Sequence, residues 1–213
     1  MIYLSIVHYS GPLGTFDYDD TEFAFADESS GLIICREVLH YIGHETDGSK
    51  IRIPEGIKLI KYMFYKCECL VTPVKIPEGV ENCEGAFKGC KNLKAASELP
   101  KSVRNCARMY ADCEALEVPC RVIPNNVGTT MEMYSGCVSL KSVSKFLGPV
   151  KNTQWMYFNC QSIELPARIL DGTEYCDCMY KGCKSLKKKV KIPESVISSA
   201  EVFHINIDKI ARI

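Results

Sequence analysis

Six cysteines recur along this chain at nearly equal intervals, and their thiols are the groups best suited to chemistry. The chain has 213 residues and thirteen cysteines; the recurring six are Cys67, Cys90, Cys113, Cys137, Cys160 and Cys183. A thiolate can act as a nucleophile, ligate a metal ion or pair in a disulfide. Each role needs particular neighbours or spacings, so the sequence around the cysteines discriminates between them.

The spacing of the cysteines argues against a metal site or a nucleophile. Cys67/Cys69 and Cys176/Cys178 are Cys-x-Cys pairs, whereas zinc sites typically separate paired cysteines by two to four residues. One thiol of each pair is expected to face solvent. A nucleophilic cysteine needs a lowered pKa beside a base, and no cysteine here stands apart from the others. We therefore expect no enzyme activity, no metal and no cofactor.

Disulfides remain open at this stage. Cysteines stacked in neighbouring coils would lie near the Cα separation that a disulfide requires. Such bonds would close loops of only one repeat and would follow the redox conditions, so reduced thiols are the prediction.

Two further groups have ligand-like spacing. His40 and His44 are four residues apart, as helical metal ligands are. Counting back 23 residues from Met63, however, places His40 at the start of one more, degenerate repeat, whose polar residues suit a terminal cap. The acidic stretch FDYDDTE lacks the residue order of a calcium loop and is expected to be a solvated loop.

The cysteines belong to an eight-residue phrase that the chain repeats. It reads MFYKCECL, AFKGCKNL, MYADCEAL, MYSGCVSL, MYFNCQSI and MYKGCKSL, beginning at Met63, Ala86, Met109, Met133, Met156 and Met179. Successive phrases begin 23 or 24 residues apart. A fixed period of this size is typical of a solenoid, in which each repeat contacts mainly its neighbours.

Other positions of the repeat also keep their character. The residue after the start of the phrase is always aromatic: Phe64, Phe87, Tyr110, Tyr134, Tyr157, Tyr180 and Phe203. Segments such as IRIP and VKIP precede each phrase, and their proline ends a short strand and sets the following turn. The apolar residues of the phrase share one helical face. The predicted fold class is an α/β repeat solenoid with a parallel sheet of short strands and short helical or 3-10 segments.

These residues resemble a known family. The AF-x-x-C-x-x-L phrase, the IP-x-x-V turn and the 23-residue period are similar to BspA-like leucine-rich repeats, over Ile51 to about Lys209. The resemblance implies a right-handed curved superhelix that binds other macromolecules without catalysis, on bacterial cell surfaces or in gut- and phage-associated proteins. Tyrosine instead of the usual phenylalanine in four repeats departs from the family pattern.

The repeat divides the chain into three parts. Residues 1–50 are predicted to form an N-terminal cap, made of a hairpin over FAFADESSGLIICREV and the degenerate repeat. Residues 51–201 form the repeats, and residues 202–213 form a C-terminal cap. The last segment, VFHINIDKIARI, is apolar enough to pair weakly with a second copy, which predicts a homodimer contact there.

Charge and hydropathy limit the partners. Lys and Arg number 26, as do Asp and Glu, so no net field favours nucleic acid or an anionic membrane. No apolar run approaches the roughly 20 residues of a membrane helix. The start, MIYLSIVHYSG, has no basic leader, which predicts a cytoplasmic protein or one whose export signal was trimmed.

A stripe of charge marks the expected strands. Eleven residues before the phrase, five of seven repeats carry a base: Arg52, Lys75, Lys145, Arg168 and Lys191. Three residues after the base, four of these five repeats carry an acidic residue: Glu55, Glu78, Asp171 and Glu194. We expect the bases of these four repeats to be compensated within their own coils, whereas Lys145, opposite Gly148, lacks a mate. The five bases are the candidate ligand surface. The leading function is recognition of a protein or glycan; the alternative is a structural spacer or surface decoration.

Overall fold

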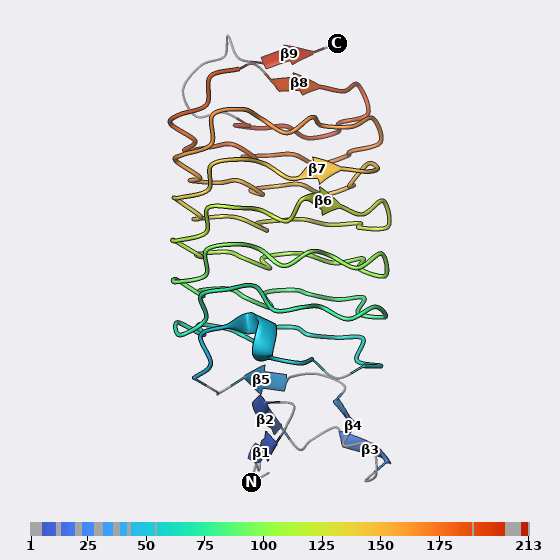
Figure 1. Ribbon diagram of the computed structural model, residues 1–213. Coiled ribbons are helices and arrows are strands. Elements are labelled where there is room, and N and C mark those ends of the chain that lie inside the picture. The colour runs from blue at the N-terminus through green and yellow to red at the C-terminus, as the bar shows by residue number, and fades with distance from the viewer. Residues whose placement is uncertain are drawn as a thin grey trace, which may run out of the picture.

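The protein is a stack of flattened coils, wound one upon another along a single axis (Figure 1). The structure, a computed structural model, describes residues 6–11, 14–19, 23–27, 32–35, 39–41, 44–53, 55–188, 190–202 and 210–212. Among these residues the one helix is η2, a 3-10 turn at Gly48–Lys50. The coils are therefore held by contacts between neighbouring coils and not by helices.

The most regular pairing between coils lies four residues before each phrase. Single parallel bridges run up the stack at this position, through Leu59, Asn82, Asn105, Thr129, Asn152, Tyr175 and Ser198. Backbone hydrogen bonds continue the ladder into the phrase, where alternate N–H groups donate to the next coil. Phe87 N, for example, donates to Met109 O at 2.8 Å. Within the phrase, the second and fourth N–H groups thus bind the next coil, as Gly89 N also does to Ala111 O at 2.8 Å.

The expectation of a helical or 3-10 segment over the phrase is wrong. The remaining N–H groups of the phrase close consecutive β-turns, as in Ala86 N to Cys83 O at 3.1 Å and Cys90 N to Phe87 O at 3.1 Å. The residue before the phrase and its fourth residue have positive φ, as in Arg108 and Asp112. Left-handed residues interrupt a right-handed helix. Turns also leave every second N–H pointing at the next coil, which a helix would not.

The predicted sheet of short strands is present only in fragments. Arg52 pairs in parallel with Lys75, β6 (Val122–Ile123) with β7 (Lys145–Phe146), and β8 (Val190–Ile192) with β9 (Ile210–Arg212). Figure 1 shows each of the last two pairs as short arrows one above the other. Among the described residues, this wall of the stack is mostly irregular, because prolines limit each strand.

The core is a set of side-chain columns that run the length of the stack. Successive aromatic rings lie nearly parallel, with centroids 4.9 Å apart for Phe64 and Phe87 and 5.6 Å apart for Tyr110 and Tyr134. The methionine or alanine, cysteine and leucine or isoleucine of each phrase are also buried, apart from Cys183, which is half-buried. Side chains 23 or 24 residues apart therefore pack directly against each other.

The N-terminal part holds two antiparallel sheets. β3 (Phe23–Asp27) and β4 (Leu32–Cys35) pair in the hairpin that FAFADESSGLIICREV predicts, so that prediction is confirmed. A second sheet, β1 (Ile6–Gly11), β2 (Gly14–Asp19) and β5 (Leu39–Tyr41), was not foreseen from the sequence. β5 joins the coils: Tyr41 N donates to Met63 O, and the Tyr41 ring lies 5.3 Å from that of Phe64, tilted by 47°.

The C-terminal part is described at residues 190–202 and 210–212. β9 adds one more strand above β8. Phe203, expected to continue the aromatic column, lies outside the described residues. The homodimer contact expected of the last segment stays a prediction.

Candidate binding face and its thiol columns

The five basic residues singled out from the sequence lie on one wall of the stack and are all exposed. We call the wall made by the residues 14 to 8 positions before each phrase the strand face. Arg52 and Lys75 are bridge partners in adjacent coils, and Lys145 is in β7 beside Val122 of β6. Arg168 and Lys191 lie in adjacent coils nearer the C-terminus and line the same groove. Glu98 and Val122 hold this position in the third and fourth coils, so the stripe consists of a basic pair, Arg52 and Lys75, and a run of three bases in successive coils.

Two grooves hollow the strand face, one at the basic pair and one at the run of three bases. The first, of about 930 Å³, is lined by Lys75 with Glu55, Glu78 and Glu98 and by the prolines Pro73, Pro77 and Pro100. The second, of about 790 Å³, is lined by Arg168, Lys188 and Lys191 with Asp171 and Glu194 and by Pro166 and Pro193. Both combine rigid apolar rings with charges of both signs.

The first groove also contains a buried polar atom without a partner. The side chain of Ser97 is 2% exposed, and its Oγ makes no hydrogen bond. Its backbone N–H is bound by the Tyr110 hydroxyl at 2.9 Å. An unsatisfied buried hydroxyl is unfavourable; the Ser97 Oγ lies close to the Tyr110 hydroxyl, beneath the surface of the groove.

The prediction that four of the basic residues are compensated within their own coils is wrong. Among the described residues, none of the five makes an ion pair, and the acids three positions further on are equally without one. Three extended residues span about 10 Å. Neighbouring coils are only about 4.8 Å apart, and Arg52 forms a parallel bridge with Lys75, which has the same sign. Like charges on directly opposed strands are unfavourable.

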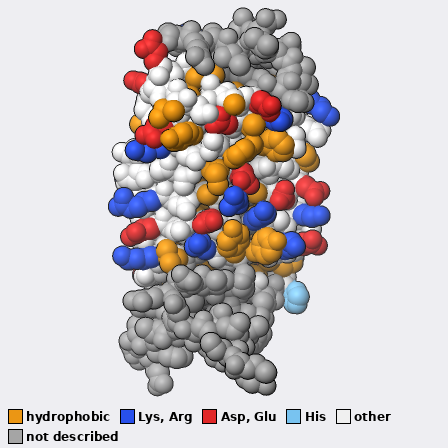
Figure 2. Space-filling model, turned by 180° about the vertical axis from the view of Figure 1, so that it is seen from behind, with side chains coloured by type: hydrophobic (Ala, Val, Ile, Leu, Met, Phe, Trp, Pro, Cys, Tyr) orange, Lys and Arg blue, Asp and Glu red, His pale blue; other side chains and the backbone are white. Residues whose placement is uncertain are grey.

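Elsewhere on the stack, charges do pair, and they pair between coils. Lys58 contacts Glu81 at 3.5 Å, Lys151 contacts Glu174 at 3.2 Å, and each partner lies 23 residues from the other. The space-filling view of the opposite side accordingly shows acidic and basic side chains interspersed along the stack (Figure 2). The strand face, with bases stacked on bases, is the exception.

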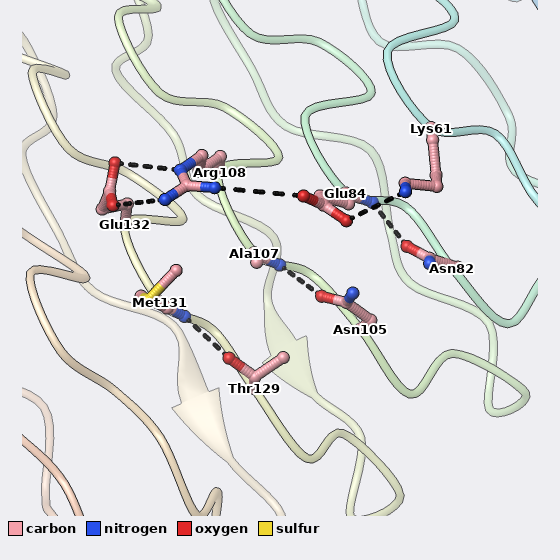
Figure 3. Close-up of polar contacts among 9 residues, drawn as sticks. All are labelled: Lys61, Asn82, Glu84, Asn105, Ala107, Arg108, Thr129, Met131 and Glu132. Atoms are coloured by element: carbon pink, nitrogen blue, oxygen red, sulfur yellow. Dashed lines mark hydrogen bonds and ion pairs between the residues drawn. The ribbon is translucent and has the colours of Figure 1, made fainter. Parts of the chain in front are cut away.

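Figure 3 shows the longest of these inter-coil networks. The Lys61 ammonium lies 3.4 Å from Glu84, whose carboxylate lies 3.9 Å from the Arg108 guanidinium. Arg108 then donates two hydrogen bonds to Glu132, at 3.2 and 3.1 Å. The hydrogen bonds to Glu132 raise the pKa of Arg108. Lys and Glu recurring at a 23-residue offset would have revealed such pairs in the sequence.

A column of polar residues next to this network was also missed. Four residues before the phrase, Asn82, Asn105, Thr129 and Asn152 each accept a hydrogen bond from the backbone N–H two residues on, with Asn105 Oδ1 to Ala107 N at 2.9 Å. Figure 3 shows the first three of these turns. The N–H groups immediately before and after this one donate to the next coil. The polar side chain therefore satisfies the one backbone donor that the ladder between coils leaves out. The recurrence of asparagine four residues before the phrase could have revealed this column in the sequence.

The cysteine column is positioned by the aromatic column of the coil before it. Each of five thiols donates to the carbonyl of an aromatic residue 26 or 27 positions earlier, as in Cys113 Sγ to Phe87 O at 3.1 Å. The thiols concerned are Cys90, Cys113, Cys137, Cys160 and Cys183. That carbonyl already closes a turn within its own coil, so the thiol occupies its second lone pair.

Burial disfavours the thiolate form of the column cysteines and of the cysteines three residues before the phrase. Desolvation raises the pKa of Cys83, Cys176 and Cys183 to about 12 and raises the pKa of Cys113 well above its ordinary value. A thiol is reactive as its thiolate, which is scarce near neutral pH in such a site. None of the twelve cysteines whose side chains the structure describes is in a disulfide.

The histidine pair considered as metal ligands from the sequence is described only at His44. His44 is exposed, and the His40 side chain lies outside the described residues. In the described part of the chain, no cluster of three or more His, Cys, Asp or Glu side chains is arranged to hold a metal ion. No described helix has the length and apolar character needed to cross a bilayer.

Comparison with known proteins adds no relative. No protein-family model, no curated protein and no solved structure matches this chain. The resemblance to BspA-like leucine-rich repeats accordingly stays a prediction from the sequence motifs.

Proposed function

We propose that this chain is a non-catalytic repeat module, a solenoid of the leucine-rich-repeat class, that binds a protein or glycan through its strand face. The observation that carries the proposal is the charge arrangement on that face. Arg52 lies beside Lys75 and Arg168 beside Lys191, with no ion pair among the described residues, whereas charges on other walls pair between coils.

A partner with acidic groups would relieve this arrangement. Two stacked bases bind one carboxylate or sulfate more favourably than either does alone, and binding removes their mutual repulsion. The proline rings and aliphatic side chains that line both grooves supply apolar contact beside the charges.

The test compares three proteins for binding to an array of acidic and neutral glycans and to an extract of the source cells. They are the wild type, the double variant Arg168→Glu/Lys191→Glu, and Arg104→Glu, which reverses an exposed charge off the strand face. The proposal expects one acidic glycan or one protein to bind the wild type and Arg104→Glu but to bind the double variant at least about tenfold more weakly.

Equal binding to all three proteins would contradict the strand face as the site. No specific ligand in either assay would favour the alternative function, a structural spacer or surface decoration. Circular dichroism of each variant establishes that the stack is intact before binding is compared.

A further inference from the structure

Cys67 and Cys69 differ from every other cysteine that the structure describes, because their sulfur atoms touch. Cys67 Sγ lies 3.3 Å from Cys69 Sγ. Cys67 begins the cysteine column, yet its thiol contacts another thiol where the five later members donate to a carbonyl. Its side chain is 8% exposed, and Cys69 is half-buried, so small molecules can approach the pair.

Local backbone geometry brings the two thiols together. Leu70 N donates to Cys67 O at 3.3 Å and closes a turn around Glu68 and Cys69. In later coils, the residue equivalent to Cys69 reaches back to the coil before, as Asn92 Nδ2 does to Glu68 O at 2.7 Å and Ser162 Oγ does to Val138 O. At the first coil, the same position carries a thiol that meets its neighbour.

The second Cys-x-Cys pair shows that spacing alone does not produce this contact. Cys176 is fully buried in the column three residues before the phrase, while Cys178 is half-buried at a left-handed residue with φ of 53°. No sulfur–sulfur contact joins these two described residues. In each pair one thiol is buried and the other, Cys69 or Cys178, is half-buried and not fully exposed to solvent as expected. Only in the first pair do the two sulfur atoms touch.

We propose that Cys67 and Cys69 form a modification site, a dithiol that is reversibly oxidised to an intramolecular disulfide by low-molecular-weight disulfides such as oxidised glutathione. The thiolate of Cys69, the more exposed residue, attacks one sulfur of the oxidant. A protein–glutathione S–S bond forms, the S–S bond of the oxidant breaks, and one glutathione thiolate leaves and takes up a proton.

The second step closes the ring. Cys67 loses its proton to solvent and attacks the Cys69 sulfur, which forms the Cys67–Cys69 bond and expels the second glutathione. In total, the two protein thiols lose two protons and two electrons, and one oxidised glutathione becomes two reduced molecules. Burial and the neighbouring thiol raise the pKa of Cys67 to about 12, so this step is expected to be the slower one and to accelerate with pH.

The chain's own sequence makes the product easy to identify. Trypsin cleaves after Lys66 and Lys75, which yields CECLVTPVK with both cysteines of the site and no others. It also cleaves after Arg168 and Lys181, which yields ILDGTEYCDCMYK with the control pair. The folded protein is equilibrated in glutathione buffers of increasing oxidised fraction, alkylated in denaturant, digested and analysed by mass spectrometry.

The proposal expects CECLVTPVK to lose two hydrogens and to escape alkylation at about tenfold less oxidised glutathione than ILDGTEYCDCMYK requires. Added dithiothreitol should restore both alkylation sites. Full alkylation of CECLVTPVK in every buffer, or oxidation of both peptides in parallel, would overturn the proposal.

Two variants separate the site from general thiol reactivity. Cys69→Ser places the residue of three other repeats at this position, and should leave Cys67 either unreacted or held as a glutathione adduct. Cys178→Ser should oxidise at Cys67/Cys69 as the wild type does. A disulfide between Cys67 and a cysteine of another peptide in Cys69→Ser, formed at the oxidised fraction that oxidises the wild type, would also contradict the assignment. The inference does not depend on the proposed function, since neither cysteine lies on the strand face.

Discussion

At the scale of single residues, the cysteine and the tyrosine of the phrase act on the backbone of neighbouring segments. The thiol binds a carbonyl of the coil before, and the tyrosine hydroxyl accepts an N–H from the opposite wall of the stack. Ser97, Cys120, Ser144 and Ala167 donate such bonds, as in Ala167 N to Tyr180 Oη at 2.8 Å. The tyrosines that depart from the family pattern thus each satisfy a buried donor.

Replacing a column thiol should destabilise the protein. Cys113→Ala removes the donor to Phe87 O and leaves a gap at a fully buried site. We expect the free energy of unfolding to fall by about 1–3 kcal/mol in urea titrations. Cys178→Ser, at a half-buried position without such a bond, should change it by less than about 0.5 kcal/mol. Equal effects would show that the thiol–carbonyl bond contributes nothing.

The tyrosine hydroxyl can be tested by a single-atom change. Tyr134→Phe leaves the Cys120 N–H without its 3.1 Å acceptor, which should cost about 1–3 kcal/mol of unfolding free energy. Tyr65→Phe removes a hydroxyl from a ring that is 41% exposed and should be nearly neutral. A neutral Tyr134→Phe would mean that the N–H finds another acceptor.

At the scale of the repeated element, the turns explain a pattern of glycines. The fourth residue of the phrase has positive φ in every coil, and the residues there alternate: Lys66, Gly89, Asp112, Gly136, Asn159 and Gly182. A Cβ built on Gly136 would lie 2.8 Å from Asp112 Oδ1 in the coil before. Glycine in alternate coils therefore makes room for the side chain of the coil below.

Gly136→Ala tests this account. The left-handed φ of 77° and the contact with Asp112 should together lower the free energy of unfolding by about 1–3 kcal/mol. Gly128→Ala is the matched control, because no positive φ is required and the nearest atom is 3.7 Å from the added Cβ; it should be neutral or stabilise slightly. Similar losses in both variants would contradict the turn geometry.

At the scale of the whole molecule, the columns bury many weak acids at once. Desolvation raises the pKa of Cys83 and Cys176 from 9.0 to about 12 and raises the pKa of Tyr110 and Tyr134 well above 10.0. The folded protein keeps these protons at a pH where the unfolded chain has lost them. The stack should consequently be sensitive to alkali throughout its length.

The free energy of unfolding should be insensitive to these groups below about pH 8 and fall as pH rises from about 9 toward 12. Between these limits the unfolded state binds fewer protons, so each such group lowers stability by about 1.4 kcal/mol per pH unit. Urea titrations at several pH values under reducing conditions would measure the slope. Cys83→Thr, which places the residue of two other repeats in that column, should reduce it; a flat or rising profile would contradict buried, protonated thiols.

Periodicity in the sequence determined which residues lie together. Side chains such as Phe64 and Phe87 recur at the period of one coil, and such residues must stack wherever coils are in register. The buried set and the hairpin over FAFADESSGLIICREV could be read from that regularity and from local turn chemistry, whereas the predicted strands form only in part.

Only the tertiary structure decided how each N–H is used and which charges meet. Apolar residues at intervals of three and four fit a helix as well as successive turns, and the choice depends on hydrogen bonds to the next coil, as from Phe87 to Met109. The pairing of coils about 4.8 Å apart placed Arg52 beside Lys75. The contact of Cys67 with Cys69 likewise depends on a turn whose closure the one-dimensional pattern does not contain.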